Sequence, residues 1–306
     1  MTATRIRAGR RSIEISNAAK PLFGDDGITK ADLASYYRDV APAMVPHVRG
    51  RPAHMDRYPD GIDGEKWVQK QVPDYFPGWI ETVRVRKRGG HVTHVVCRDA
   101  ATLAYLANQA SITPHVWVSR ADRIHNPDLM IFDLDPSGDD FGLVRRTARL
   151  VRDLLAEVGL PAFLKTTGSR GLHLAVPLDR RASFDGVRTL SRDLARLAAS
   201  RDPEHLTVEV RKEKRRGRLF VDSLRNAYAQ TYAPPYAVRA RPGAPVSTPI
   251  DWEELGRVGP RTHTMANVLS RLERRGDPWR GMWRGAHGLR EARERVDDLL
   301  AEEIPG

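Results

Sequence analysis

Two aspartates at the end of an apolar run are the residues of this sequence best suited to carry chemistry. Asp133 and Asp135 follow the apolar residues 129–132 and precede Pro136, which ends strand pairing. Because side chains alternate between the two faces of a strand, both carboxylates point to the same side. Carboxylates held this close repel each other unless a positive charge lies between them, and a divalent cation with oxygen ligands fits that place. The alternative is structural, since an aspartate at a strand end often caps a turn or the next helix.

A glycine-rich segment follows the aspartates and links two predicted strands. It reads Lys165-Thr-Thr-Gly-Ser-Arg-Gly-Leu-His173. Its two glycines permit a tight backbone with amides turned outward, which suits phosphate oxygens. The side chains expected to add donors or positive charge are Lys165, Thr167, Ser169, Arg170 and His173. The segment is not a Walker A sequence, because the Gly-x-x-x-x-Gly-Lys-Ser/Thr order is absent, and a glycine-rich turn is by itself an ordinary loop.

A third acid ends another apolar strand. Asp222 closes the segment Arg218-Leu-Phe-Val, and its structural alternative is again a turn residue. Together with Asp133 and Asp135 it would complete a three-carboxylate site, enough for two divalent ions. Two such ions about 3.5–4 Å apart hold the attacking and leaving oxygens of an in-line phosphoryl transfer.

The elements that must position these residues follow from hydrophobic periodicity and turn signals. Strands and helices do not alternate strictly, which predicts an α+β fold with antiparallel pairing. Thr29 and Asp32 form a capping-box-like helix start. Strands are expected at 12–16, 79–97 (a hairpin), 129–135, 162–166, 172–177, 206–211 and 218–223, extended chain at 234–241, and helices from 29, at 100–110, 141–158, 183–199, 262–275 and 287–303.

Composition narrows the class of protein. The 306 residues are 41% hydrophobic, so a packed core is expected, and the single cysteine, Cys97, excludes an intramolecular disulfide and a cysteine-based zinc knuckle. Cys97 lies in an apolar strand pattern and is expected to be buried. No apolar run reaches the roughly 18 residues of a membrane span, and the basic N-terminus lacks an apolar signal core, so a cytoplasmic protein is expected. The net charge of +11 favours polyanionic partners, although a GC-rich genome also enriches arginine.

Four motifs in order carry a family resemblance. They are Phe132-Asp-Leu-Asp-Pro136, Thr167-Gly-Ser-Arg-Gly-Leu-His173, Phe220-Val-Asp222 and Ala233-Pro-Pro-Tyr-Ala-Val-Arg-Ala-Arg-Pro-Gly-Ala-Pro245. Together they closely resemble the polymerase domain of bacterial DNA ligase D, in the archaeo-eukaryotic primase superfamily. The resemblance extends from about Ile13 to the C-terminal helices.

The resemblance implies an archaeo-eukaryotic primase fold. A catalytic module resembling an RNA-recognition motif, with antiparallel sheets flanked by helices, is joined to an N-terminal α/β lobe, and the active site lies between them. We expect one primase-polymerase domain over residues 1–306. Its approximate parts are an N-terminal lobe at 12–120, the catalytic module at 121–260 and C-terminal helices at 261–306.

The activity implied by the resemblance is template-directed addition of ribo- or deoxyribonucleotides to primer 3′ ends. It serves non-homologous end joining or gap filling, with two Mn²⁺ or Mg²⁺ ions per active site. The implied partners are DNA with gaps, overhangs or broken ends, NTPs or dNTPs, the Ku end-binding protein and an ATP-dependent DNA ligase, in a nucleoid-associated cytoplasmic setting. A ligase domain does not fit within 306 residues, and the starting methionine favours a stand-alone polymerase over an excised domain.

The resemblance also assigns roles in the active site. It makes Asp133, Asp135 and Asp222 the metal ligands and places Thr167, Arg170 and His173 at the triphosphate, with Thr167 at a position that is often serine. His115 matches a histidine near the sugar of the incoming nucleotide and the primer end, whereas the residues alone favour a core histidine. Arg239 matches an active-site arginine that Arg241 assists.

Further roles implied by the resemblance concern DNA. Asn17, Lys20 and Lys30 match residues that bind a downstream 5′-phosphate. Trp67 is expected to stack on bases, while Val68, next to it, departs from the family's aromatic pattern. Gln230 receives no role. Two basic turns are expected to cap hairpins and hold phosphates in salt-sensitive binding, the alternative being solvated turns. They contain Lys87, Arg88, Lys212, Lys214, Arg215 and Arg216.

Two other classes compete with a polymerase. Haloacid-dehalogenase-type phosphohydrolases also end a strand with Asp-x-Asp, but their motif usually continues with Thr or Val, whereas Pro136 follows here. A non-catalytic DNA-end-binding module would keep the fold and lose the chemistry, yet all three acids are present.

Overall fold

The computed structural model describes residues 4–304, which fold into two compact units. Unit 1 holds the chain up to Asp122 with 231–248 and 263–277, and unit 2 holds 123–230, 249–262 and the segment from Pro278 onward. The division after Asp122 lies close to the expected boundary at 120. The C-terminal segment does not form a part of its own, because helix α5 (Val268–Arg275) belongs to unit 1 and helix α6 (Arg290–Glu303) to unit 2.

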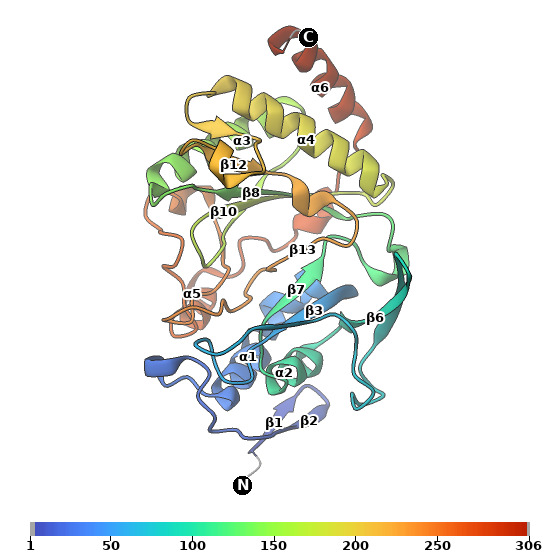
Figure 1. The fold of residues 1–306 in the computed structure, drawn as a ribbon, viewed down its shortest axis with the longest axis vertical. Helices are drawn as coiled ribbons and strands as arrows, with labels where there is room; N and C mark the ends of the chain where they lie inside the picture. The colour runs from blue at the N-terminus through green and yellow to red at the C-terminus, as the bar shows by residue number, and fades with distance from the viewer. Residues whose placement is uncertain (1–3, 305–306) are drawn as a thin grey trace. The chain divides into compact units, whose positions relative to one another are not determined.

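Unit 2 is built on a sheet that, among the described residues, has six strands in the order β11-β12-β8-β10-β9-β14. Figure 1 labels three of them, β12, β8 and β10. All neighbours in it are antiparallel except β11 and β12. The strands are β8 (Leu129–Asp135), β9 (Phe163–Thr166), β10 (Leu172–Pro177), β11 (Leu206–Thr207), β12 (Leu219–Asp222) and β14 (Pro249–Ile250).

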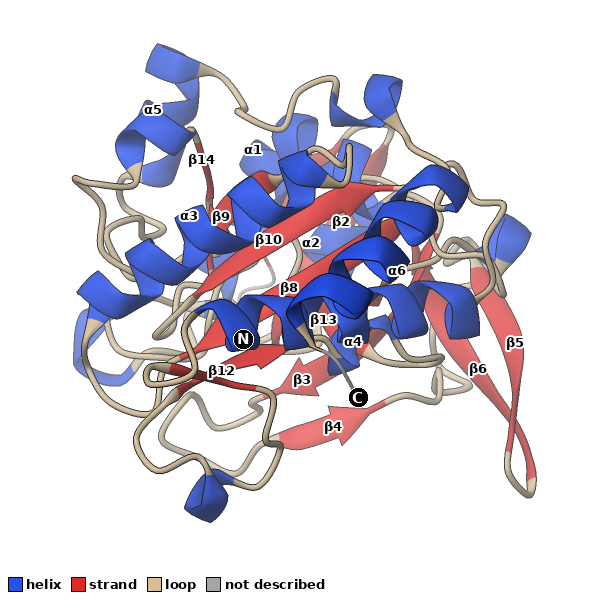
Figure 2. Ribbon diagram, turned by 90° about the horizontal axis from the view of Figure 1, so that it is seen from above, coloured by secondary structure: helices blue, strands red, loops and turns tan. Residues whose placement is uncertain are grey.

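Helices α3 (Phe141–Glu157) and α4 (Phe184–Arg201) cover one face of this sheet, as Figure 2 shows from above. Met130, Phe132 and Leu134 of β8 are fully buried in the core that includes side chains of both helices. Because side chains alternate along a strand, the residues between them face away from this core. The packing of β8 therefore fixes the direction of Asp133 and Asp135.

Unit 1 contains a second sheet, in the order β13-β7-β3-β6-β5, with β4 added to β3. Helices α1 (Lys30–Val48) and α2 (Ala100–Asn108) pack together, and α2 also contacts β7. An N-terminal hairpin of β1 (Thr4–Ala8) and β2 (Arg11–Ile15) lies against both helices. The strands of the sheet are β3 (Arg51–Arg57), β4 (Trp67–Gln69), β5 (Thr82–Lys87), β6 (Gly90–Cys97), β7 (Ser111–Trp117) and β13 (Thr231–Tyr232).

Two predicted helix starts are confirmed by the capping hydrogen bonds of the structure. Thr29 and Asp32 form a reciprocal capping box at α1, and Ser183 caps α4 by accepting from the amide of Gly186. The α+β fold with mainly antiparallel pairing is confirmed, and Cys97 is buried. Helix α5 begins only at Val268, later than the predicted 262.

The prediction of a hairpin between 206 and 223 is wrong. Strand β11 has only two residues and pairs with β12 in parallel, and a 3-10 turn (Lys212–Lys214) lies in the connection. The Arg215 guanidinium donates to the carbonyl oxygens of Glu209 and Val210, so it occupies acceptors that a longer β11 would need. Residues 234–241, predicted to be extended, are interrupted by a turn at Pro235 and Tyr236, where Tyr236 has a positive φ of 66°.

No helix among residues 4–304 is long and apolar enough to cross a membrane.

Candidate functional site

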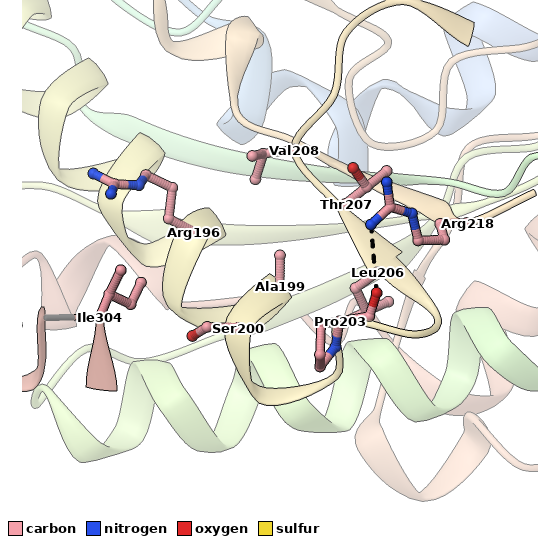
Figure 3. A pocket seen from close by; sticks show the side chains of 9 residues that line it. All are labelled: Arg196, Ala199, Ser200, Pro203, Leu206, Thr207, Val208, Arg218 and Ile304. Carbon is pink, nitrogen blue, oxygen red and sulfur yellow. Dashed lines mark hydrogen bonds between the residues drawn. The ribbon is translucent and has the colours of Figure 1, made fainter. Parts of the chain in front are cut away.

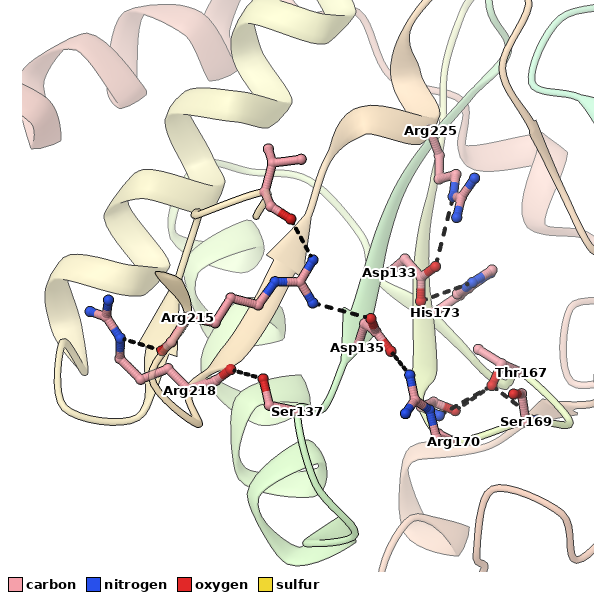
Figure 4. A network of polar contacts seen from close by, with 12 residues as sticks. Asp133, Asp135, Ser137, Thr167, Ser169, Arg170, His173, Arg215, Arg218 and Arg225 are labelled. Carbon is pink, nitrogen blue, oxygen red and sulfur yellow. Dashed lines mark hydrogen bonds and ion pairs between the residues drawn. The ribbon is translucent and has the colours of Figure 1, made fainter. Parts of the chain in front are cut away.

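Three neighbouring strands of unit 2 bring the predicted acids into one row. Asp133 on β8 is directly opposite Asp222 on β12 and, on its other side, opposite His173 on β10. Asp135 lies two residues further along β8, so it shares the same face. Register alone thus places the three carboxylates and one imidazole beside each other, as Figure 4 shows for three of them.

Three basic side chains, of which the two arginines are charged and the histidine is neutral at pH 7, border this row of acids. The Nε2 atom of His173 is 3.3 Å from Oδ1 of Asp133, and Nη2 of Arg170 is 3.1 Å from Oδ1 of Asp135 (Figure 4). Arg225 was not predicted; its Nε lies 3.8 Å from Oδ2 of Asp133 and 4.0 Å from Oδ2 of Asp222. Its position three residues after Asp222, in the turn that leaves the strand, is the sequence signal that could have identified it.

Arg215 lies apart from the exposed basic turn in which it was expected. Its side chain is buried over the ring of Phe220, and its Nη1 is 3.3 Å from Oδ2 of Asp135. The guanidinium therefore neutralises an acid of the row instead of facing solvent. Lys212, Lys214 and Arg216 of the same segment are exposed.

The ionisation of the acids follows from these neighbours. Burial alone would raise the pKa of Asp133, but the charges of His173, Arg225 and Lys165 hold it at about 2. Burial raises the pKa of Asp222, Asp133 adds to the rise, and the backbone amide of Leu224 opposes it by donating a hydrogen bond of 2.6 Å. An additional positive charge at Asp222 would lower its pKa and stabilise the charged row.

The donor set of this row fits hard divalent cations, which prefer carboxylate oxygens. Asp133 and Asp222 face each other on adjacent strands, and Asp135 points the same way. In the part of the chain that the structure describes, the three acids do not form a group in which one carboxylate oxygen from each lies within 4.8 Å of the other two. The arginines and His173 pair with them instead, so a cation would replace some of these contacts.

The glycine-rich turn between β9 and β10 differs from expectation in one respect. The amides of Ser169 and Gly171 donate to Oγ1 of Thr167, both at 3.2 Å, so they turn inward and not outward toward a phosphate. The Thr167 hydroxyl in turn donates to the carbonyl of Gly171 at 3.0 Å. The turn is a closed hydrogen-bonded unit that presents the Arg170 side chain next to Asp135.

His173 should make the protein less stable in mild acid. Burial, together with nearby Lys165, lowers its pKa from 6.5 to about 4, so it is neutral at pH 7. Between these pH values the unfolded chain takes up a proton that the folded chain does not, and the free energy of unfolding falls as pH drops, by on the order of 1–3 kcal/mol. Denaturant unfolding at pH 7 and pH 5 should show a smaller loss for His173→Gln. The exposed His91→Gln control should match the unsubstituted protein, and equal losses in all three would contradict this cause.

Unit 1 holds a cluster of two histidines and one aspartate, of which only His115 was predicted. His54 and Asp56 on β3 and His115 on β7 are the one such group, within residues 4–304, whose potential ligand atoms all lie within 4.8 Å of one another. These residues could hold a metal ion. Burial lowers the pKa of His115 to about 4, against the pull of Asp56.

Comparison with known proteins identifies the family. A family description, "LigD, primase-polymerase domain", matches residues 29–279. The chain belongs to this family. A solved structure of the "Polymerase Domain from Mycobacterium tuberculosis Ligase D in complex with DNA" superposes with a TM-score of 0.84 at 34% identity, covering 90% of this chain and 99% of that one.

Curated LigD proteins show the same relationship. The chain is 36% identical over 279 residues to the "Multifunctional non-homologous end joining protein LigD" of Mycobacterium bovis, covering 88% of this chain and 37% of that protein. The corresponding Pseudomonas aeruginosa protein is 32% identical over 278 residues, covering 89% and 33%. The chain thus spans about a third of the length of these relatives. Its membership in the primase-polymerase family supports a nucleotidyltransferase-type enzyme.

The residues of this LigD-family chain that were predicted to bind a 5′-phosphate lie together in unit 1. The backbone amide of Lys30 donates to the carbonyl oxygen of Lys20, and the amide of Lys20 donates to the carbonyl oxygen of Asn17. Burial lowers the pKa of Lys30, and the nearby charges of Lys20 and Arg57 lower it further. Two or three cations this close repel each other, and an anion would relieve that repulsion. Arg57 was not predicted.

An exposed aromatic surface lies beside these cations. Trp67 is 60% exposed and pairs across β3–β4 with Arg57. Tyr75, which was not predicted, is 62% exposed, and its hydroxyl oxygen lies 3.3 Å from Nη1 of Arg57. Exposed aromatic rings next to cations are the usual platform for single-stranded bases. Lys87 and Arg88 are exposed in the turn between β5 and β6, as predicted from the hairpin pattern.

A pocket of unit 2 can be compared with the row of acids as a possible cation site. It measures about 270 Å³ and lies between α4, β11 and Ile304, with Arg218 at its wall donating to the carbonyl of Pro203 (Figure 3). None of its lining residues carries a carboxylate, so it does not match the donor set of the acid row.

Proposed function

We propose that this domain adds nucleotides to primer 3′ ends by template-directed transfer, with Asp133, Asp135 and Asp222 as its metal ligands. The single observation that carries the proposal is the row of acids across β10, β8 and β12, bordered by Arg170 from the glycine-rich turn. Membership in the LigD primase-polymerase family supports it.

Two Mn²⁺ or Mg²⁺ ions held by the three carboxylates would lower the pKa of the primer 3′-hydroxyl and neutralise the leaving pyrophosphate. Arg170 bears a guanidinium that is partly exposed next to Asp135, so it can turn to triphosphate oxygens and stabilise the charge that develops there. His173 and Lys165 face each other across β9 and β10, and burial together with the charge of Lys165 lowers the pKa of His173 and keeps it neutral. A neutral imidazole can donate one hydrogen bond without repelling a cation.

Residues of both units supply the substrate-binding roles in this proposal. His115 would contact the sugar of the incoming nucleotide, and Arg239 would act as an active-site arginine that Arg241 assists. Thr167 and Ser169 would support the triphosphate through the turn they form. Asn17, Lys20 and Lys30 would bind a downstream 5′-phosphate. The substrates would be gapped, overhanging or broken DNA with NTPs or dNTPs, and the partners in end joining would be Ku and an ATP-dependent ligase at the nucleoid.

Primer extension separates this function from its two rivals. A labelled primer–template should be extended with ribo- and deoxyribonucleotides when Mn²⁺ or Mg²⁺ is present, with one nucleotide type chosen by the template. A phosphohydrolase would release phosphate from a small phosphoester and leave the primer unchanged. A non-catalytic end-binding module would shift the DNA in a gel without extending it, and either of these outcomes would contradict the proposal.

The hairpin turn of unit 1 offers a test of DNA binding. Lys87→Glu combined with Arg88→Glu should weaken DNA binding and reduce the slope of log affinity against log salt by about 2, because each phosphate contact releases roughly one counterion. Fluorescence anisotropy at several salt concentrations measures both quantities. Arg152→Glu on α3 is a control, since Arg152 already pairs with Asp153. An unchanged slope in the double variant would show that this turn is merely solvated.

A further inference from the structure

We propose that His54, Asp56 and His115 bind a divalent transition-metal ion of the Zn²⁺ type at a site of their own in unit 1. This site would be independent of the carboxylate row in unit 2, which suits harder cations. The inference goes beyond the proposed function, because nothing in nucleotidyl transfer requires an ion with histidine ligands. It gives His115 a second role, in which Nε2, the nitrogen that faces Asp56, binds the ion and the other ring nitrogen is left for the nucleotide sugar.

The strand register places the three ligands on one face of unit 1's sheet. His54 on β3 is directly opposite His115 on β7, and Asp56 lies two residues after His54. The two imidazole rings are stacked with their centroids 5.1 Å apart and their planes 12° from parallel. The site is therefore built on paired strands, and paired strands hold metal ligands at fixed positions better than a loop does.

The spacing of the ligand atoms matches a metal better than a set of hydrogen bonds. Nε2 of His54 is 3.4 Å from Oδ1 of Asp56, and Nε2 of His115 is 3.4 Å from Oδ2. Ligands bound tetrahedrally to zinc at about 2.0–2.1 Å lie roughly 3.3–3.4 Å from each other. Oδ1 of Asp56 is buried and has no hydrogen-bond partner within residues 4–304, and such an atom calls for a water or an ion.

The surroundings of the second ring nitrogen of His54 also support a metal ion at Nε2. Nδ1 of His54 lies 3.5 Å from Oγ1 of Thr231, a hydroxyl oxygen that can accept a hydrogen bond from the Nδ1–H group. With the proton on Nδ1, the lone pair of Nε2 faces the Asp56 carboxylate, and two lone pairs repel unless a cation lies between them. Metal-binding histidines usually donate their other ring N–H to such an outer partner.

The chemistry of the ligands selects the class of ion. Two imidazoles and one carboxylate suit Zn²⁺ and neighbouring first-row ions, and three protein ligands leave a position for water. Lys66 opposes binding, because its Nζ lies 3.3 Å from Oδ2 of Asp56. Its side chain is 46% exposed, so the ammonium group can move into solvent when an ion takes its place.

Metal titration of the purified chain tests the proposal. After chelator treatment, the protein should bind one equivalent of Zn²⁺ by calorimetry at pH 7.5, and Co²⁺ in its place should give visible absorption of a tetrahedral site. His54→Gln should weaken binding at least tenfold, as loss of a ligand does, and Lys66→Met should strengthen it. Circular dichroism checks that both variants fold, and Asp56→Asn provides a second ligand variant.

The controls separate this site from the carboxylate row. His91→Gln, an exposed histidine, and Asp133→Ala should each keep the Zn²⁺ affinity of the unsubstituted protein. The proposal is overturned if no stoichiometric Zn²⁺ binds, if folded His54→Gln binds as tightly as the unsubstituted protein, or if Asp133→Ala loses the ion. Primer extension is not the readout, so failure of the polymerase proposal would leave this result unaffected.

Discussion

Asp133→Ala should lower the rate of primer extension at least about a thousandfold, equivalent to ~4 kcal/mol of transition-state stabilisation. Asp133 is the central acid of the row, opposite both Asp222 and His173, and it is held ionised with a pKa of about 2. Its loss removes the carboxylate that the other two acids cannot replace. Single-turnover extension with saturating nucleotide measures the chemical step.

DNA binding provides the internal control for this variant. Affinity for the primer–template should change by less than about threefold, since the cations proposed to contact DNA are unaltered. Asp153→Ala, an exposed acid on the outer side of α3, should extend primers at the normal rate. Metal-dependent synthesis retained in Asp133→Ala would disprove the assignment of the acid row.

Gly171→Ala should produce the largest loss of stability of any single methyl group added in unit 2. A Cβ atom at this position would lie 2.0 Å from the carbonyl oxygen of Leu134, a backbone atom of β8. The turn and β8 must therefore move apart, at a cost of roughly 2–5 kcal/mol. The same movement separates Arg170 from Asp135, so extension should fall with stability.

Denaturant unfolding measures this effect against a matched glycine. Gly256→Ala adds the same methyl group in unit 2, where nothing lies within 4 Å of the added Cβ, and should change the free energy of unfolding by less than about 0.5 kcal/mol. If Gly171→Ala unfolded at the same denaturant concentration as Gly256→Ala, the close approach of turn and strand would not exist in solution.

Local rules account for the parts of the fold that the sequence predicted correctly. The alternation through β8 fixed the common face of Asp133 and Asp135, and the side chains of Thr29 and Ser183 marked helix starts that the structure reproduces. Each of these features depends on residues within a few positions of one another. The sequence signal is strong because propensity, capping and burial agree there.

The features that the sequence did not predict depend on contacts with residues far away along the chain. The parallel pairing of β11 with β12 and the inward fold of Arg215 toward Asp135 follow from tertiary contacts with β8. The inward amides of the Thr167 turn depend on two hydrogen bonds to one hydroxyl oxygen, which no sequence pattern predicts. The cluster around Asp56 needs the exact register of β3 against β7, which places His54 opposite His115.

The kinetics of combined substitutions test the acid row most directly. Asp133→Ala, Asp135→Ala, Asp222→Ala and the triple variant should be compared in one primer-extension assay, with folding checked by circular dichroism. Residues that act as one unit lose their effect together, so each single variant should fall nearly to the level of the triple variant. Losses that add up from one substitution to the next, or any single variant that keeps most of the template-directed incorporation, would contradict a shared metal site.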